Sequence, residues 1–376
     1  MKTLAIISSQ AFSLINFRAP LIRELVAKRV RVFALAPDFD EQRRREIIAL
    51  GAEPIDFSLT RTGMNPWRDI LDTLRLSILL HRLRPDATLC YFIKPVIFGT
   101  LAAWMARVPR RVAMIEGLGY VFTESADGAP MRRRLLRRAV SGLYRLALSR
   151  AAQVVFLNGD DRAEFCRLGL VNMDNSVILG AIGVDLAEWP MAPPVVAPLC
   201  FLLVARLLRE KGIGEFAAAA RLVKARYPLV RFVLLGGLDS NPGAVSRAEV
   251  EQWVGEGLLE WPGHVDVQPW LRQASVFVLP SYREGVPRST QEAMALGRPV
   301  ITTDAPGCRE TVVDGENGFL VPVRDVPALA GAMLKFVEQP ALVESMGRCS
   351  RRMAEVRFDV HRVNRRLLDI IGVNPA

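Results

Sequence analysis

One stretch of the sequence decides the fold: Leu279-Pro280-Ser281-Tyr282-Arg283-Glu284-Gly285-Val286-Pro287-Arg288-Ser289-Thr290-Gln291-Glu292-Ala293-Met294-Ala295-Leu296-Gly297-Arg298-Pro299-Val300-Ile301. An apolar strand ends at Leu279, a tight loop follows, and a helical pattern over residues 289–296 leads into a second strand. Pro287 can stand just before the first helical residue, and Gly297 can supply the left-handed residue that ends a helix. A strand, a loop, a helix and a strand in this order indicate a parallel α/β sheet.

The same alternation of apolar runs and helical patterns continues along the chain in both directions. We expect strands at residues 4–8, 30–36, 53–57, 87–91, 111–115, 153–157, 177–179, 199–204, 231–235, 276–279 and 299–303, helices at 17–28, 67–83, 97–106 and 214–227, and a largely helical end from 326 onward. This pattern predicts two doubly wound, Rossmann-like domains of the α/β class. Open α/β sheets bind ligands beyond the carboxyl ends of their strands, so we expect a site in a cleft between two facing domains.

A proline-rich segment suggests where the two domains meet. Proline resists both helix and central strand, and prolines are dense between residues 188 and 198. The expected organisation is a first domain over residues 1–190, a linker over 191–198, a second domain over 199–357, and a C-terminal helix over 358–376 that crosses back to the first domain.

Composition limits the kind of protein. With 376 residues, of which 51% are apolar, the chain can fill two cores, which excludes a disordered, collagen-like or disulfide-stapled scaffold. The cysteines are scattered and include no Cys-x-x-Cys pair, so we expect neither a zinc site nor a disulfide frame. Apolar runs are broken before the roughly 18 residues that a transmembrane helix needs. We therefore expect a protein of the reducing cytoplasm.

The net charge of +10 is concentrated in the first half of the chain. Residues 129–159 contain no acid, and arginines alternate there with leucines: Arg132, Arg133, Arg134, Arg137 and Arg138. This pattern predicts a basic amphipathic helix, which is either a solvated surface or a helix that docks on an anionic membrane. Nucleic-acid binding is not expected, because the chain has no RNP pattern, zinc finger or Gly-rich basic tail.

Two glutamates and two cations are the main candidates for chemistry. Glu284 lies in the loop before a glycine, where a carboxylate can hold a hydroxylated ligand or take part in a reaction. Glu292 lies in the next helix, either as a ligand group or as the partner of Ser289 in a capping box. Arg206 and Lys211 follow the first strand of the second domain and could hold phosphate oxygens opposite a helix N-terminus.

These residues resemble the motifs of a large enzyme family, the retaining GT-B glycosyltransferases of family four. The matching motifs are Glu284-Gly285-x-Pro287-x4-Glu292-Ala293 with Arg206 and Lys211 upstream, Pro262-Gly263-His264-Val265, Gly183-Val184-Asp185 and Asp314-Gly315-x-Asn317-Gly318. Two further stretches, Ser58-x-Thr60-Arg61-x4-Pro66 and Ile115-Glu116-Gly117-Leu118-Gly119, are similar to a narrower bacterial group. That group transfers N-acetylgalactosamine or a related sugar to polyprenyl-diphosphate-linked sugars.

The resemblance implies a GT-B fold and a role for each matching residue. Glu284 would contact the donor sugar as a catalytic group, Glu292 would hold the ribose hydroxyls, and Arg206 and Lys211 would neutralise the donor diphosphate. The remaining donor contacts would come from Gly285, Val286, Pro287 and Arg288 at the sugar and phosphate, and from Gly263, His264 and Val265 at the base. Transfer would retain configuration by attack on the face that the nucleoside diphosphate leaves, and its phosphate would take the acceptor proton.

Three residues of the first domain are candidates for the acceptor side. Glu116 stands where many family members have a histidine, and it is either a second catalytic group or a solvated loop glutamate. Arg18 and Lys94 are candidates for binding an acceptor diphosphate, or else ordinary surface cations. Asp38-Phe39-Asp40 has the form of a metal-binding Asp-x-Asp pair, but we expect it to begin a helix. We therefore expect no required metal and no other cofactor.

Together these features predict a hexosyltransferase that uses a UDP-sugar as co-substrate. The acceptor would be a polyprenyl-diphosphate-linked saccharide of bacterial surface polysaccharide or glycan assembly, met at the inner face of the cytoplasmic membrane by a peripherally bound enzyme. One alternative is a nucleotide-sugar 2-epimerase on the same fold. Another is a non-catalytic membrane-binding or nucleic-acid-binding protein. A dinucleotide-dependent oxidoreductase is disfavoured, because no Gly-x-Gly-x-x-Gly follows a predicted strand.

Overall fold

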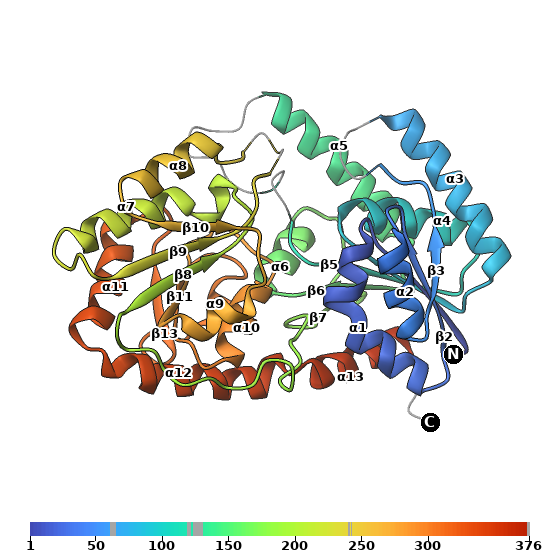
Figure 1. The fold of residues 1–376 in the computed structure, drawn as a ribbon. Helices are drawn as coiled ribbons and strands as arrows, with labels where there is room; N and C mark the ends of the chain where they lie inside the picture. The colour runs from blue at the N-terminus through green and yellow to red at the C-terminus, as the bar shows by residue number, and fades with distance from the viewer. Residues whose placement is uncertain (61–64, 119–121, 123–130, 240, 242, 374–376) are drawn as a thin grey trace. The chain divides into compact units, whose positions relative to one another are not determined.

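The structure is a computed structural model that describes residues 1–60, 65–118, 122, 131–239, 241 and 243–373. The chain forms two compact units, Met1–Ile182 together with His361–Ala376, and Gly183–Val360. Each unit has one parallel β-sheet covered by helices (Figure 1). The predicted α/β class with two doubly wound domains is therefore confirmed.

The first unit is built on a seven-stranded sheet in the order β3-β2-β1-β4-β5-β6-β7. Its strands are β1 (Thr3–Ile7), β2 (Arg31–Ala36), β3 (Glu53–Asp56), β4 (Ala87–Tyr91), β5 (Arg110–Ile115), β6 (Gln153–Phe156) and β7 (Ser176–Ile178). Its helical segments are α1 (Ala11–Ala27), α2 (Glu41–Ala49), α3 (Pro66–Leu83), η1 (Pro95–Gly99), α4 (Thr100–Met105), α5 (Met131–Leu148), α6 (Gly159–Arg167) and α13 (Val360–Ile371). The strand order reverses between β1 and β4, which is where such sheets usually bind ligands.

The central strands of this sheet are continuous apolar runs, because helices cover both of their faces. Every residue of β4 is buried, as are Leu4 to Ile7 of β1. Right-handed crossovers place α3, α4 and α5 on one face, where α4 contacts both of its neighbours, and α1 and α2 on the other. The helices that follow β1, β3 and β5 all begin at the carboxyl edge of the sheet.

The second unit is built on a six-stranded sheet in the order β10-β9-β8-β11-β12-β13. Its strands are β8 (Cys200–Val204), β9 (Arg231–Leu235), β10 (Glu260–Gly263), β11 (Val276–Leu279), β12 (Val300–Thr303) and β13 (Gly318–Val321). Its helical segments are η2 (Arg209–Lys211), α7 (Ile213–Lys224), α8 (Arg247–Gly255), α9 (Gln268–Gln273), α10 (Arg288–Ala295), η3 (Arg309–Thr311), α11 (Val326–Glu338), α12 (Ala341–Met353) and η4 (Ala354–Phe358). The strand order reverses here between β8 and β11.

Two edge strands of the second sheet were not predicted. β10 contains Pro262, which an edge strand tolerates because one of its sides needs no ladder hydrogen bond. β13 begins at Gly318, where a Cβ atom would lie 1.7 Å from the carbonyl oxygen of Val300. Short strands with proline or glycine have no strong alternating pattern, so the sequence alone hides them.

The ends of the two units differ from the expected boundaries. The expected linker, residues 191–198, packs on the second unit, where Arg298 donates to the carbonyl oxygen of Pro193 at 2.7 Å. The last helix, α13, belongs to the first unit. There Asn364 Nδ2 lies 3.1 Å from Glu24 Oε1, and Arg110 donates to the carbonyl oxygen of Ile370 at 2.7 Å.

Candidate active site

Two loops of the second unit meet beyond the carboxyl ends of neighbouring strands β8 and β11. The backbone N–H of Tyr282 donates to the carbonyl oxygen of Glu210 at 2.9 Å. Gly212 has φ +71°, and a Cβ there would lie 2.2 Å from the carbonyl oxygen of Pro280. A glycine is therefore required for the turn η2 to pack against the loop after β11.

This packing joins two of the residues expected at the donor site. Lys211 Nζ donates to Glu284 Oε1 at 2.5 Å, and the side chains are 15% and 13% exposed. Glu284 is held from its backbone as well, because its N–H donates to the carbonyl oxygen of Pro306 at 3.0 Å. Partial burial strengthens the attraction between the two charges while each keeps some access to solvent. The pair presents a fixed ammonium and a fixed carboxylate at the edge of the sheet.

Arg206 has a different partner. Its Nη1 donates to Asp239 Oδ2 at 2.9 Å, and more than half of its side chain is exposed. Asp239 follows β9, so the guanidinium is held beside the strand next to β8. Among the described residues, Arg206 forms no hydrogen bond or ion pair with Lys211 or Glu284. The two cations expected to act together are thus held by separate carboxylates.

The helix α10 begins as expected and leaves its first turn open. Pro287 precedes the first helical residue and provides no side-chain cap. Gly297, with φ +76°, follows the helix as its left-handed end residue. The backbone N–H groups at such an uncapped N-terminus can bind an anion.

Glu292 is not part of a capping box. The helix begins at Arg288, so Glu292 lies beyond the third helical position that a capping box requires. Its Oε1 instead accepts from Arg288 Nε at 2.8 Å, and both side chains are mostly buried. Burial raises the pKa of Glu292, and the charge of Arg288 opposes that shift. The capping-box interpretation of Glu292 is therefore wrong, and its role as a ligand group stays a prediction.

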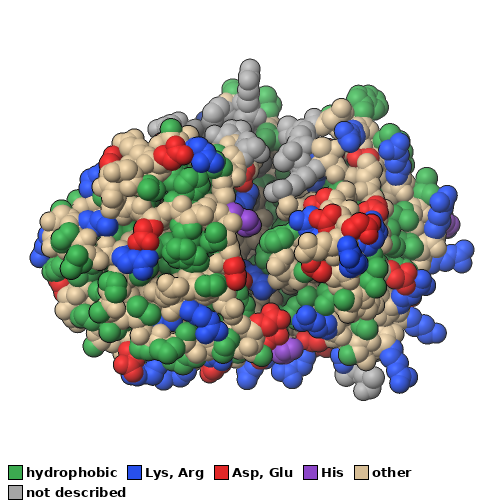
Figure 2. All heavy atoms as spheres, in the orientation of Figure 1, with side chains coloured by type: hydrophobic (Ala, Val, Ile, Leu, Met, Phe, Trp, Pro, Cys, Tyr) green, Lys and Arg blue, Asp and Glu red, His purple; other side chains and the backbone are tan. Residues whose placement is uncertain are grey.

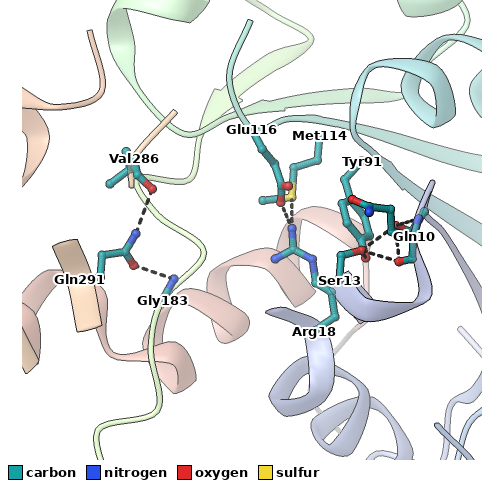
Figure 3. Close-up of polar contacts among 10 residues, drawn as sticks. Gln10, Ser13, Arg18, Tyr91, Met114, Glu116, Gly183, Val286 and Gln291 are labelled. Carbon is teal, nitrogen blue, oxygen red and sulfur yellow. Dashed lines mark hydrogen bonds and ion pairs between the residues drawn. The ribbon is translucent and has the colours of Figure 1, made fainter. Parts of the chain in front are cut away.

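Gln291 is a residue that the sequence reasoning missed. It is fully buried in α10, and its Nε2 donates to the carbonyl oxygen of Val286 at 3.1 Å. Its Oε1 accepts from the N–H of Gly183 at 3.1 Å (Figure 3). Gln291 therefore fixes the loop at residues 285–287 to the segment that carries the Gly183-Val184-Asp185 motif. The sequence signal that could have indicated this buried glutamine is its position beside the apolar residues of the helix, Ala293 to Ala295.

The residues expected at the base lie at the end of β10. The carbonyl oxygen of Gly263 accepts from the N–H of Gly236 at 2.9 Å. His264 is exposed and Val265 half-buried, and His264 Cβ would be 3.5 Å from a Cβ built on Gly237. These residues therefore line the same loop cluster that carries Asp239.

In the first unit, Arg18 and Glu116 contact each other near the point where the strand order reverses. Arg18, from α1, donates to Glu116 Oε1 and is almost fully buried. Its guanidinium lies 4.6 Å from the ring centre of Tyr91, and its Nη2 is 3.6 Å from Met114 Sδ (Figure 3). The solvated-surface alternatives for both residues are wrong. Tyr91 also contacts Ser13 through its hydroxyl, at 2.9 Å.

Lys94 is likewise not a solvated cation. Its Nζ donates to Asp69 Oδ1 at 2.8 Å, and both side chains are mostly buried. Asp72, one turn further along α3, is buried too, and its carboxylate oxygens have no hydrogen-bond partner. Lys94 thus lies against the carboxylate of Asp69, and its role toward an acceptor diphosphate stays a prediction.

The predicted basic amphipathic helix is confirmed as α5. Arg134 and Arg138 are exposed, whereas Arg137 pairs with Glu164 at 3.1 Å. The side chains of Arg132 and Arg133 lie outside the described part, as do residues 61–64 and Gly119 of the two first-half motifs. In the described segments, no helix is both long and apolar enough to cross a membrane.

The Asp-x-Asp pair caps two helices. Asp40 precedes α2 and accepts from the N–H of Arg43 at 2.7 Å, as expected for a helix start. Asp38 accepts from the N–H of Ala11, the first residue of α1, at 2.6 Å. Over the residues that the structure covers, no three His, Cys, Asp or Glu side chains gather in a way that could hold a metal ion.

Comparisons with known proteins now give this geometry a context. The family model described as "Glycosyl transferases group 1" matches residues 198–339. N,N'-diacetylbacillosaminyl-diphospho-undecaprenol alpha-1,3-N-acetylgalactosaminyltransferase of Campylobacter jejuni is 28% identical over 97% of this chain and 96% of its own. Residues 198–339 thus resemble a group 1 glycosyltransferase domain, and the similarity to curated glycosyltransferases supports a hexosyltransferase enzyme.

Other similar proteins agree. The capsular polysaccharide biosynthesis glycosyltransferase CapM of Staphylococcus aureus is 23% identical over 77% of each chain. Among solved structures, sucrose-phosphate synthase from Thermosynechococcus elongatus has a TM-score of 0.77 at 19% identity, covering 98% of both chains. Anabaena Alr3699/HepE in complex with UDP-glucose has a TM-score of 0.76 at 18% identity, covering 100% of both. The GT-B fold that the sequence resemblance implied is confirmed.

Proposed function

We propose that this glycosyltransferase moves a hexose or N-acetylhexosamine from a UDP-sugar to a polyprenyl-diphosphate-linked saccharide during assembly of a bacterial surface polysaccharide or glycan. The observation that carries the proposal is the Lys211–Glu284 pair, held at 2.5 Å beyond the carboxyl ends of β8 and β11. Support for the acceptor comes from the Campylobacter jejuni relative, whose name includes diphospho-undecaprenol. Support for the donor comes from the HepE complex with UDP-glucose.

The chemistry follows from where charge develops. When the bond between sugar and diphosphate breaks, negative charge grows on the departing phosphate, and fixed cations near it lower the barrier. Lys211 would supply that positive charge, with the open N-terminus of α10 as a second source. Glu284 would keep Lys211 oriented and would accept from a hydroxyl of the donor sugar. Arg206 would reach the diphosphate only by sharing its guanidinium with Asp239.

The remaining donor contacts are assigned by position in the same loops. The backbone of residues 285–288 would face the sugar and phosphate, Glu292 would accept from the ribose hydroxyls, and residues 263–265 would contact uracil. Transfer with retention of configuration and without a metal belongs to the same proposal. NMR of the anomeric proton in the product tests the first, and unchanged turnover after treatment with EDTA tests the second.

In the first unit, we assign Glu116 to the acceptor side. Its carboxylate is oriented by Arg18 and is partly accessible, with 12% of the side chain exposed. A carboxylate so placed would orient or deprotonate an acceptor hydroxyl. Glu116 would thus take the place of the histidine that the family resemblance implies, with Arg18 as its positioning partner rather than as a direct ligand of the acceptor.

The deciding experiment is a donor screen with purified protein. A panel of UDP-sugars is supplied with and without a polyprenyl-diphosphate saccharide, and release of UDP is measured. We expect release from one UDP-sugar that depends on the acceptor. A UDP-sugar that changes its own sugar without any acceptor would establish the epimerase instead, and no turnover in any combination would favour a non-catalytic protein.

A further inference from the structure

The exposed face of α3 is apolar, which is unusual for a surface helix. Five large hydrophobic side chains of this helix stand in solvent: Trp67, Ile70, Leu71, Leu74 and Ile78. Their spacing places them along one side of the helix, three or four residues apart. Trp67 is 82% exposed. We call these five residues the α3 stripe.

The charges around the α3 stripe have one sign. The acids of this helix, Asp69 and Asp72, point into the protein and are buried, whereas Arg68, Arg75 and Arg82 are exposed. Within Pro66–Leu83, all of which the structure describes, the exposed surface therefore combines apolar side chains with cations. Figure 2 shows green and blue side chains alternating along the right-hand margin, where Figure 1 draws α3.

We infer that the α3 stripe is a surface that enters the headgroup region of an anionic lipid bilayer. A helix with this make-up lies in the plane of the interface, with its apolar side chains among the upper acyl chains and its arginines at the phosphates. Tryptophan favours that depth because its ring is apolar and its N–H is polar. Attraction between arginines and anionic lipids adds to the apolar contribution.

The position of the α3 stripe in the first unit supports this partner. Trp67 lies at the start of α3, and therefore at the carboxyl edge of the sheet, which is also the edge that carries Glu116. Helix α5 lies on the same face of the sheet as α3 and also begins at this edge, with Met131 and Leu135 exposed beside Arg134. The two helices extend one surface of apolar side chains and cations on either side of α4.

The inference rests on the proposed function in one respect, since a lipid-linked acceptor explains why the enzyme would sit on a membrane. It assigns the apolar part of that contact to α3, whereas the sequence pointed only to the arginines of α5. With the stripe in the interface, the start of α3, and with it the carboxyl edge of the first sheet, would lie near the membrane surface at which a polyprenyl diphosphate presents its headgroup.

The test is co-sedimentation of the full chain with phosphatidylcholine vesicles that contain or lack phosphatidylglycerol. The stripe variant carries Trp67→Ser, Leu71→Gln and Leu74→Gln. Its matched control carries Leu222→Gln, Leu229→Ser and Val254→Gln, which replace exposed apolar residues of the second unit. We expect the stripe variant to partition onto the anionic vesicles about tenfold more weakly, or worse, and the control to bind like wild type.

A second variant separates charge from apolar contact. Arg68→Gln with Arg82→Gln should weaken binding at low salt and match wild type at high salt, because screening removes only the electrostatic part. Equal binding of wild type and the stripe variant would overturn the inference. So would a wild-type dimer, seen by sedimentation velocity without vesicles, that the stripe substitutions dissociate, since the stripe would then be an interface between copies of the chain.

Failure of the inference and failure of the proposed function remain distinguishable. With a short-chain, water-soluble prenyl-diphosphate saccharide, the stripe variant should transfer sugar as fast as wild type, and it should lose activity only on acceptor embedded in vesicles. If neither protein transfers sugar to either acceptor, the proposed function fails while the sedimentation result still decides the membrane surface.

Discussion

Each unit of this glycosyltransferase holds a cation–carboxylate pair near the carboxyl edge of its sheet, and the surroundings of the two pairs differ. Arg18 is 2% exposed and is enclosed by Tyr91 and Met114, so its charge is held against Glu116 and away from solvent. Lys211 stands on a short turn and remains partly exposed, so its ammonium is accessible to a ligand. An enclosed pair orders the fold and orients its carboxylate, whereas a pair at the end of a loop can take part in binding.

The largest expected effect is on the enclosed pair. Removing one partner of a buried ion pair leaves an uncompensated charge, so Arg18→Met should destabilise the first unit by about 3–5 kcal/mol. Calorimetry and hydrogen exchange of the first-unit strands measure this loss. Arg31→Met is the matched control, because Arg31 pairs with Glu53 on the exposed surface and its removal should change little. Equal stability of the two variants would show that Arg18 does not order the unit.

A substitution in the partly exposed Lys211–Glu284 pair should lower kcat rather than the stability of the protein. Glu284→Gln keeps the shape of the side chain and removes the carboxylate that would accept from the donor sugar, so kcat should fall by about a hundredfold to a thousandfold. The Kd for UDP should change little, because UDP lacks the sugar that Glu284 would contact. Glu316→Gln, at an exposed position of the same unit, serves as the control. A variant with unchanged kcat would remove Glu284 from the reaction.

The cations around the donor loops should differ in how much each contributes to the affinity for UDP. Lys211→Met should weaken UDP binding by about tenfold to a hundredfold, the range expected for a charged hydrogen bond. Arg206→Met should cost less, because Arg206 is half exposed and shares its charge with Asp239. Arg209→Met, on the same turn as Lys211 but paired with Glu249, should leave binding unchanged. Isothermal titration with UDP measures all three, and a reversed order would mean that Arg206 is the principal phosphate ligand.

Local patterns were enough to predict the strands of both sheets except the edge strands β10 and β13, because strand and helix periods and the positions of Pro287 and Gly297 act over a few residues. The partners of the charged residues were not predictable, since they depend on packing between distant segments. Asp239 lies 33 residues beyond Arg206, and Asp69 lies 25 residues before Lys94. The predicted capping box was wrong because α10 begins at Arg288, so that Ser289 lies inside the helix and does not precede it.

The exposed face of α3 is a second feature that the sequence pattern did not predict. Its apolar residues fit a helical period, which correctly predicts a helix over residues 67–83. Asp69 and Asp72 face the protein, whereas Trp67 faces solvent. Sequence periodicity alone would place the apolar stripe inside. Only the packed structure reveals that the helix buries both of its acids and exposes that stripe.

The smallest expected effect is the pH dependence of UDP-sugar binding that Glu292 would cause. Glu116, a carboxylate of the first unit, serves as the comparison. Burial raises the pKa of Glu292, so its ionised form, which accepts most strongly from ribose hydroxyls, is lost on acidification at a higher pH than for an ordinary glutamate. Affinity for a UDP-sugar should therefore rise as pH increases from the ordinary glutamate range toward neutrality. The diphosphate of a UDP-sugar is a diester and does not titrate there, which makes it the right probe. Titration calorimetry across this window should show the rise in wild type and a flat profile in Glu292→Gln, whereas Glu116→Gln in the first unit should leave the slope intact. A slope that survives in Glu292→Gln would assign the titration to another group and remove Glu292 from the nucleoside contact.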